Sequence, residues 1–202
     1  MLMRLATVFA LTAVLLTPDG VAFTAEKKGG FDALDDLKKD FIVAIGDAKS
    51  WKVNRGVIEC SGKPNGYICT KKEYSNYVLT LEIRYPEKAG NTGVLNYISG
   101  KHKIWPACVE VQGLYGRMAQ IFAMGCAKGP RDGGDDAARQ KARKPHTKWN
   151  KLDITSKDGV ISAKINGVFI GRAGPYPVRK GRIGFQSEGA PVHFRNIRIK
   201  EL

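Results

Sequence analysis

Short runs in which apolar and polar residues alternate recur after Trp51, and this period of two most constrains the fold. In Tyr77 to Tyr85 the odd-numbered residues are apolar or aromatic, whereas the even-numbered ones are mainly polar. Because successive side chains of a β-strand point to opposite faces, the pattern predicts a strand with one buried face. Further strands are predicted over residues 57–60, 66–70, 93–98, 107–112, 151–155, 160–165, 168–171, 182–186 and 191–200.

Glycine, proline and asparagine separate these runs. Asn166-Gly167 joins two apolar runs, which predicts a two-residue type I′ hairpin because both central residues need a positive φ. Helix-like spacing is confined to Phe31 to Phe41. The chain is therefore predicted to be all-β, an antiparallel sandwich or jelly roll with at most one short N-terminal helix.

The last predicted strand contains a shift of phase. Its apolar positions are Val192 and Phe194 and then Ile197 and Ile199, so the period of two is interrupted. One extra residue near Arg195-Asn196 would cause this shift, and it predicts a β-bulge.

The N-terminus is typical of an exported protein. Arg4 precedes the apolar run Leu5 to Leu16, which is shorter than the roughly twenty residues that cross a bilayer. This predicts a signal peptide over residues 1–22, cleaved after Ala22 or, as second choice, after Ala25, and a soluble periplasmic or secreted protein. A retained anchor is the weaker alternative. Residues 23–50 would be a lead-in segment, and residues 51–202 one β-sandwich domain.

The formal net charge of +14 favours anionic partners. The densest basic run, Arg139 to Lys148, has no interleaved aromatic residues, so nucleic acid is disfavoured. An anionic envelope or polysaccharide surface fits the charge better. A basic surface that only keeps the protein soluble is the alternative.

Four cysteines occur in the chain. In an exported protein they predict two disulfides, with three connectivities open. Cys60 and Cys69 flank a turn-rich stretch, so their pairing would close a hairpin, and Cys108 with Cys126 follows by elimination. Buried free thiols are the alternative interpretation.

The alternation of apolar and polar residues also indicates which polar side chains share a face of a strand and could form a site. Glu110 and Gln112 share one face of their predicted strand, and Glu82 and Arg84 share the polar face of another. If these strands are neighbours, Glu82, Arg84 and Glu110 form a charged cleft on a curved sheet. The alternative is an exposed sheet face whose charges only keep the protein soluble.

The segment Ala127 to Lys148 is rich in glycine and charge, and a flexible loop is predicted there. Its carboxylates Asp132, Asp135 and Asp136 match no calcium motif, so they make only a weak metal candidate. The histidines His102, His146 and His193 are scattered, and none is assigned to a metal site.

A set of ordered motifs resembles the 3-keto-disaccharide hydrolase family over Trp51 to Leu202. The motifs are Tyr77 to Arg84, Asn91-Thr92-Gly93-Val94, Glu110-Val111-Gln112, Trp149-Asn150, Ile165-Asn166-Gly167, Gly181 to Gln186 and Phe194 to Lys200. Each motif is short, and the specificity lies in their order.

The resemblance implies a concanavalin A-like jelly-roll sandwich that cleaves glycosides already oxidised at C3. A ketone at C3 acidifies the C2 proton, so a carboxylate can remove it and the group at C1 can leave. Glu110 is the candidate acid or base, Arg84 the cation beside the developing enolate, and Gln112 a hydroxyl-orienting residue. Glu82 and Asn91 are further candidates for substrate binding. No cofactor is assigned, although a divalent metal could take the role of Arg84 instead.

Three departures from the family pattern favour a rival function. Tyr97 and Tyr115 stand where many members carry charged residues, and Ser187-Glu188-Gly189 lacks a histidine. Together with Trp105, the two tyrosines could stack on sugar rings in a non-catalytic carbohydrate-binding module, although each could instead be packed. A structural, envelope-associated domain is a third hypothesis.

Overall fold

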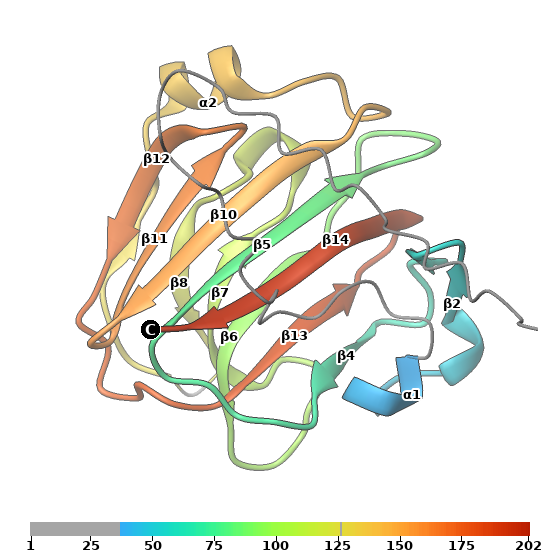
Figure 1. Cartoon of the computed structure of the whole chain (residues 1–202), viewed down its shortest axis with the longest axis horizontal. Helices are drawn as coiled ribbons and strands as arrows, with labels where there is room; N and C mark the ends of the chain where they lie inside the picture. The colour runs from blue at the N-terminus through green and yellow to red at the C-terminus, as the bar shows by residue number, and fades with distance from the viewer. Residues whose placement is uncertain (1–36, 126) are drawn as a thin grey trace, which may run out of the picture.

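A computed structural model describes residues 37–125 and 127–202. Within these ranges two antiparallel seven-stranded sheets, sheet A and sheet B, pack face to face (Figure 1). Sheet A has the spatial order β1 (Phe41–Ile45), β4 (Gly66–Thr70), β13 (Arg182–Ser187), β6 (Gly93–Ser99), β7 (Ala107–Gln112), β8 (Ile121–Met124) and β9 (Arg131–Asp132). Sheet B has the order β12 (Val168–Ala173), β11 (Val160–Ile165), β10 (Asn150–Lys157), β5 (Tyr77–Arg84), β14 (Val192–Glu201), β3 (Val57–Cys60) and β2 (Trp51–Asn54). The jelly-roll β-sandwich expected from the sequence is confirmed.

The core lies between the sheets and is filled by alternate residues of each strand. In β5 the buried positions are the odd-numbered ones, as the period of two predicts. Phe185 of sheet A and Phe194 of sheet B meet with ring centroids 5.2 Å apart. Burial of such side chains stabilises the fold by about 1.5–3 kcal/mol each.

Two polar contacts also cross the core. The Tyr77 hydroxyl donates to Asn96 Oδ1 over 2.6 Å, which joins β5 to β6. The Tyr97 hydroxyl hydrogen-bonds the Ser156 hydroxyl and joins β6 to β10. These bonds satisfy polar atoms that would otherwise be costly to bury, and they tie the two sheets together.

The last two long strands enter the middle of the sheets. β13 lies between β4 and β6, and β14 lies between β5 and β3 (Figure 1). The C-terminal end of the chain therefore completes both sheets.

Two local predictions are confirmed. Ile165 pairs with Val168, and Asn166 and Gly167 both have positive φ, as a two-residue hairpin requires. In β14 the register with β5 shifts between Arg195 and Arg198, where Asn196 has φ 51°. This irregularity is the bulge expected from the phase of the apolar residues.

The sequence missed several elements. Strand β1 belongs to sheet A, so the sandwich includes residues before Trp51. Strand β8 was not expected. The segment predicted as a flexible loop contains β9 and helix α2 (Asp136–Ala142). Short helical turns occur at α1 (Leu37–Asp40), η1 (Ala48–Ser50) and η2 (Tyr115–Arg117).

The helix predicted over Phe31 to Phe41 is only partly described, and Phe41 begins β1 instead of ending a helix. The predicted signal peptide lies outside the described residues. Of the helices in the described ranges, none has the length and apolar character needed to span a bilayer.

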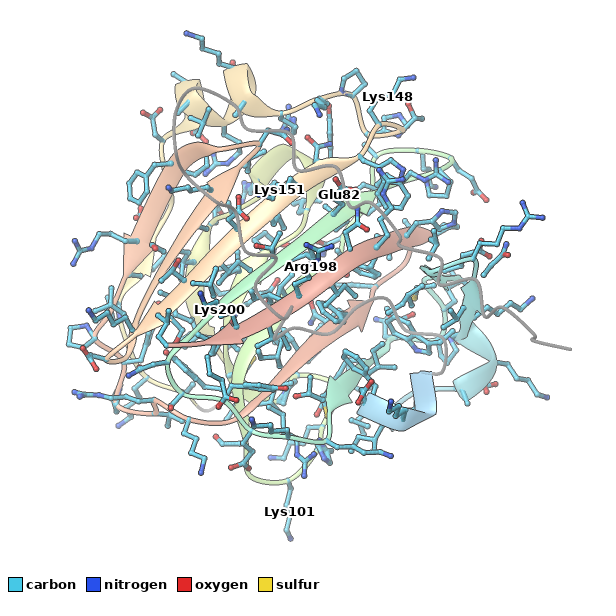
Figure 2. All side chains as sticks on the ribbon, viewed as in Figure 1. Glu82, Lys101, Lys148, Lys151, Arg198 and Lys200 are labelled. Atoms are coloured by element: carbon cyan, nitrogen blue, oxygen red, sulfur yellow. The ribbon has the colours of Figure 1, made fainter. Side chains whose placement is uncertain are left out.

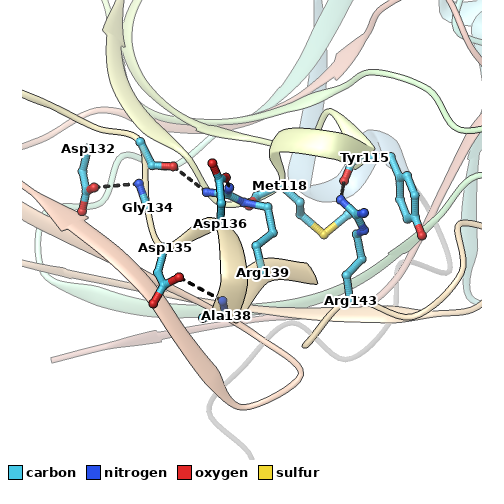
Figure 3. A network of polar contacts seen from close by, with 10 residues as sticks. Tyr115, Met118, Asp132, Gly134, Asp135, Asp136, Ala138, Arg139 and Arg143 are labelled. Carbon is cyan, nitrogen blue, oxygen red and sulfur yellow. Dashed lines mark hydrogen bonds and ion pairs between the residues drawn. The ribbon is translucent and has the colours of Figure 1, made fainter. Parts of the chain in front are cut away.

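Helix α2 is held by a buried arginine (Figure 3). Arg139 is 1% exposed, donates to the Met118 carbonyl over 2.7 Å and also contacts the Gly133 carbonyl and Asp136. Asp135 accepts from the Ala138 amide and caps the helix.

Asp132, the remaining carboxylate of the suggested calcium site, accepts hydrogen bonds from the amides of Gly134 and Arg172. All three carboxylates of that segment therefore act within the fold.

The predicted pairing of Cys60 with Cys69 is wrong. Both are buried free thiols. Cys60 lies on sheet B and packs in the core between the sheets, whereas Cys69 lies on sheet A in a separate apolar cluster with Tyr67 and Leu95. The turn-rich stretch between them crosses from one sheet to the other and does not close a hairpin. Cys108 is also a buried free thiol, and Cys126 lies outside the described residues.

Candidate functional site

The candidate site lies on the outer face of sheet A, the face turned away from sheet B. In β7, Val109 and Val111 point into the core, so Glu110 and Gln112 point outward. The same alternation turns Gln186 outward from β13, because Ile183 and Phe185 are core residues. Three polar side chains from two strands thus project onto one face.

Gly93 of β6 makes room for two of these side chains. A Cβ atom built on Gly93 would lie 2.1 Å from Gln186 Oε1 and 2.7 Å from Glu110 Oε1. Both side chains therefore converge over the glycine backbone, and any larger residue there would displace them. Glycine is required at this position for space, and its freedom of φ is not needed.

The converging side chains have unused hydrogen-bonding capacity. Glu110 is 3% exposed and Gln186 is 1% exposed. Within the described ranges, Glu110 Oε1, both amide atoms of Gln186 and Asn91 Oδ1 are buried without a hydrogen-bond partner. An unpaired buried polar group costs about 1–3 kcal/mol. Each such atom calls for an explanation, and a bound ligand or water that completes its hydrogen bonds is one.

The environment of Glu110 disfavours its charge. Burial, and secondarily the negative charge of Glu188, raises the pKa of Glu110 to about 8. Burial also raises the pKa of Glu188, although a hydrogen bond from the Asn91 side chain opposes this effect. Asn91 lies next to Glu188 and Gly189 through backbone bridges. A carboxyl group titrating near neutral pH suits general acid or base chemistry.

Gln112 lies at the edge of this group. Its Oε1 accepts from the Leu114 amide over 2.8 Å, which leaves its NH₂ group to donate to a ligand. The chain then forms η2, where Tyr115 contacts Arg143, the residue that follows α2. The Arg143 guanidinium contacts the Tyr115 carbonyl and lies 4.0 Å from the ring centroid (Figure 3).

A cation on this face was not identified from the sequence. Glu110 pairs across β7–β8 with Phe122, and Phe122 pairs with Arg131 of β9. The Arg131 guanidinium lies 4.7 Å from the centroid of the Phe122 ring. Arg131 and Phe122 therefore form an exposed edge of the face that carries Glu110.

The predicted cleft of Glu82, Arg84 and Glu110 does not form. Glu82 and Arg84 lie on β5 of sheet B and point to the outer face of that sheet, on the opposite side of the sandwich from Glu110. Neither neighbours β7, because β5 pairs with β10 and β14. The period of two gives the face of β5 on which Glu82 and Arg84 lie, but it does not say which sheet the strand joins.

Both residues have partners on sheet B. Glu82 accepts from Arg195 over 2.5 Å and from Asn196 over 3.1 Å. Arg84 donates to His193 Nδ1 over 3.3 Å and lies 4.6 Å from the Trp149 ring centroid. The structure therefore does not support the role of Arg84 beside the enolate.

The predicted sugar-stacking role of Tyr97 is also wrong. Tyr97 is 1% exposed and its ring is part of the core. Tyr115 is half-buried; its hydroxyl donates to the Lys144 carbonyl, and its ring meets His146 edge-on. Trp105 is 45% exposed in the loop between β6 and β7, and its proposed contact with sugar stays a prediction.

A pocket of about 230 Å³ lies elsewhere, at the end of β6 and β7. Its walls include Tyr97, Val109 and Tyr176, and it contains none of the converging polar side chains. The unpaired polar atoms are the stronger indication of chemistry, so we place the site at Glu110.

The sequence also allows a divalent metal at the site in place of Arg84. In the described part of the chain, no group of three or more histidine, cysteine, aspartate or glutamate side chains is arranged to hold a metal ion.

The sequence missed Gln186, Glu188 and Gly93 as site residues. A signal for Gln186 was present in the sequence, because the period of two places it on the opposite face of its strand from the apolar Ile183 and Phe185. What was lacking was the position of β13 beside β6, which brings Gln186 next to Gly93 and Glu110.

The model of the 3-keto-alpha-glucoside-1,2-lyase-like domain matches residues 25–200. The chain belongs to this family. The matched range begins before Trp51, in agreement with the place of β1 in sheet A. The chain is therefore a carbohydrate-active, glycosyl hydrolase-like domain. No curated protein matches the sequence.

Solved structures share the fold of this family member. A candidate glycosyl hydrolase from Parabacteroides distasonis ATCC 8503 aligns with a TM-score of 0.60 and 22% identity, over 81% of this chain and 89% of that one. The carbohydrate-binding module CBM66 from Bacillus subtilis has a TM-score of 0.58 and 10% identity, over 78% and 93% of the two chains. A β-glucanase from Bacillus licheniformis has a TM-score of 0.56 and 11% identity, over 88% and 100%.

Proposed function

We propose that this protein cleaves 3-keto-glycosides, with Glu110 as the proton-transferring residue. The observation that carries the proposal is the convergence of Glu110 and Gln186 over Gly93, with buried polar atoms that have no partner in the described chain. The family supports a glycoside with a ketone at C3 as the substrate.

The proposed reaction begins at C2 of the sugar. Ionised Glu110 accepts the C2 proton, and the electron pair of the C2–H bond forms a C2=C3 double bond as the ketone becomes an enolate. When the enolate collapses back to the ketone, the C1–O bond breaks and a C1=C2 double bond forms. Glu110 then returns its proton to the departing oxygen. Addition of water across C1=C2 would complete hydrolysis.

The raised pKa of Glu110 suits this step. A carboxylate with a pKa of about 8 is a stronger base than an ordinary one, and a useful fraction is ionised near neutral pH. Because the base is the ionised form, the rate should rise as the pH increases through about 8.

The amides of Gln186 and Gln112 are the proposed donors to the substrate. Gln186 has a buried NH₂ group without a partner among the described residues, and the Gln112 NH₂ group is oriented by the bond that its Oε1 accepts. Such groups can hold the enolate oxygen or a sugar hydroxyl. One well-placed donor at a developing oxyanion contributes about 3–4 kcal/mol.

The decisive experiment is release of nitrophenol from the two anomers of 4-nitrophenyl 3-keto-glucoside by the purified protein. Turnover by the parent and its loss in Glu110→Gln, with an unchanged circular-dichroism spectrum, would support the proposal. Glu110→Gln is close to isosteric with the protonated side chain, so a loss of activity would report chemistry and not packing.

The rival carbohydrate-binding function makes a different prediction. A binding module would retain the 3-keto-glucoside without releasing nitrophenol from either anomer. Tyr97 no longer supports that function because its ring is in the core. Undiminished turnover in Glu110→Gln would reject Glu110 as the base.

The proposal includes export, which rests on the N-terminal pattern of Arg4 and the apolar run Leu5 to Leu16. Expression of the full chain in a bacterium followed by fractionation would test it. Recovery of a shortened protein that begins at Phe23 in the periplasm or medium is expected. An uncleaved protein in the membrane fraction would favour an anchor instead.

A further inference from the structure

The outer face of sheet B carries an ordered set of basic side chains. The three adjacent strands β10, β5 and β14 form the middle of this sheet. Their outward positions include Lys151, Arg84, Arg195, Arg198 and Lys200. We call these five residues the basic face.

The bulge in β14 increases the charge of this face. Arg195 pairs with Glu82, and Arg198 pairs with Thr80 two residues along β5. Without the register shift, residues 195 and 198 would point to opposite faces, because their separation is odd. The bulge therefore turns both arginines outward.

Basic side chains outnumber carboxylates among the outward positions of these three strands. The outward carboxylates on the three strands are Glu82, which pairs with Arg195, and Asp153, whose Oδ1 lies 3.0 Å from Lys151 Nζ. Arg84 instead donates to His193. Burial and the charge of Arg84 lower the pKa of His193, which is consistent with a neutral ring that accepts this bond. The five cations of the face thus exceed its carboxylates.

The basic face is accessible. Lys151, Arg198 and Lys200 are exposed, and Lys148 lies beside the same strands (Figure 2). In a sheet, side chains on one face repeat about every 6.6–6.8 Å along a strand and about every 4.8 Å across strands. The charges therefore form a two-dimensional array over a broad surface, which fits an extended polyanion better than a single small anion.

The aromatic residue on this face indicates which polyanion is favoured. Trp149 already packs against two guanidinium groups, with Arg84 at 4.6 Å and Arg195 at 4.1 Å from its ring centroid. Proteins that bind single-stranded nucleic acid need aromatic faces on which bases stack, and this ring is occupied by cations. No helix of the described chain projects from the face to enter a groove of duplex DNA.

We propose that the basic face is a docking surface for an anionic polysaccharide, distinct from the site at Glu110 on sheet A. The partner is a chain carrying sulfate or carboxylate groups, held through charge complementarity by the basic face, whose exposed members are Lys151, Arg198 and Lys200. Binding at this face would keep the protein on acidic glycan while the opposite face stays open. The inference does not depend on the proposed catalytic function.

Binding of dextran sulfate and of neutral dextran of equal length to the purified protein would test this proposal at about 0.1 M salt, where exposed charges more than about 10 Å away are largely screened. The test variant is Arg198→Glu with Lys200→Glu. The control variant is Lys101→Glu with Lys103→Glu, which changes the net charge equally but lies in the exposed loop between β6 and β7 (Figure 2). A thermal unfolding curve for each variant would verify that it is folded.

We expect the parent to bind dextran sulfate and not dextran. The test variant should lose affinity on the order of tenfold or more, while the control should change by less than about twofold. Equal losses in both variants would overturn the proposal, because binding would follow net charge alone. No binding by the parent would also overturn it. Tighter binding of single-stranded DNA or of anionic lipid vesicles at matched charge would overturn the choice of polysaccharide.

Discussion

The two outer faces of the sandwich each carry a glutamate, and the two glutamates differ in burial and in hydrogen-bond partners. Glu82 of sheet B is partly exposed and accepts hydrogen bonds from Arg195 and Asn196. Glu110 of sheet A is almost fully buried, Glu188 lies near it, and one of its oxygens has no partner among the described residues. Both glutamates lie on alternating strands. The difference teaches that the strand pattern gives only the face on which a carboxylate lies, whereas burial and neighbouring charge set its environment.

The largest effect is expected from matched glutamate substitutions on the two faces. Glu110→Gln should reduce kcat/KM on a 3-keto-glucoside by about 10³-fold, since a positioned base contributes about 10²- to 10⁴-fold. Glu82→Gln should change it by less than about threefold, because its side chain points away from the site. Steady-state kinetics on both variants would measure this.

Equal losses of kcat/KM in Glu110→Gln and Glu82→Gln would contradict the assignment of the site to the outer face of sheet A. They would mean that the outer face of sheet B also contributes to turnover, directly or by holding the sandwich together.

Gln186→Leu should separate activity from stability. Loss of the buried amide removes a proposed donor, so kcat should fall by about 10²-fold. The free energy of unfolding should stay the same or rise by about 1 kcal/mol, because an unpaired polar group is replaced by an apolar one. Kinetics and urea unfolding would measure the two effects. A large loss of stability would show that Gln186 has a structural partner in the protein.

The stability of Glu110→Gln should depend on pH less than that of the parent. The pKa of Glu110 is raised in the folded state, so its protonated form favours folding at pH below about 4.5, and this contribution is lost as the pH rises through about 8. Glutamine cannot ionise. The variant should therefore have a higher Tm than the parent above about pH 8 and a similar Tm near pH 4.5. Thermal unfolding over this pH range is the measurement, and parallel curves would contradict it.

The smallest effect is expected from Glu188→Gln. Removal of its negative charge should lower the pKa of Glu110, because that charge is the second cause of the raised value. The midpoint of the pH–rate profile should then move to lower pH while the maximal rate changes little. An unchanged midpoint would leave burial as the sole cause.

Local structure could largely be predicted from the chain. The strand at Tyr77 to Tyr85, the Asn166-Gly167 hairpin and the bulge near Arg195 each follow from steric and periodic rules that act over a few residues. Glu110 and Gln112 were correctly placed on one outward face for the same reason. Helix α2 was missed because its short amphipathic stretch lies in a segment rich in glycine and charge, and its buried Arg139 depends on distant carbonyl groups.

The sequence by itself determined the all-β character, the phase of the strands at 77–85, 107–112 and 191–200, and the family, because alternation and ordered motifs are properties of the chain. Only the tertiary structure decided which strands are neighbours. The insertion of β13 beside β6 brings Gln186 close to Glu110. The pairing of β5 with β10 and β14 places Arg84 on the other sheet. The tertiary structure also places Cys60 and Cys69 on different sheets, in separate apolar clusters. The physical reason is that the period of two specifies a face of a strand, whereas partners in a jelly roll are distant in sequence and are selected by packing between sheets.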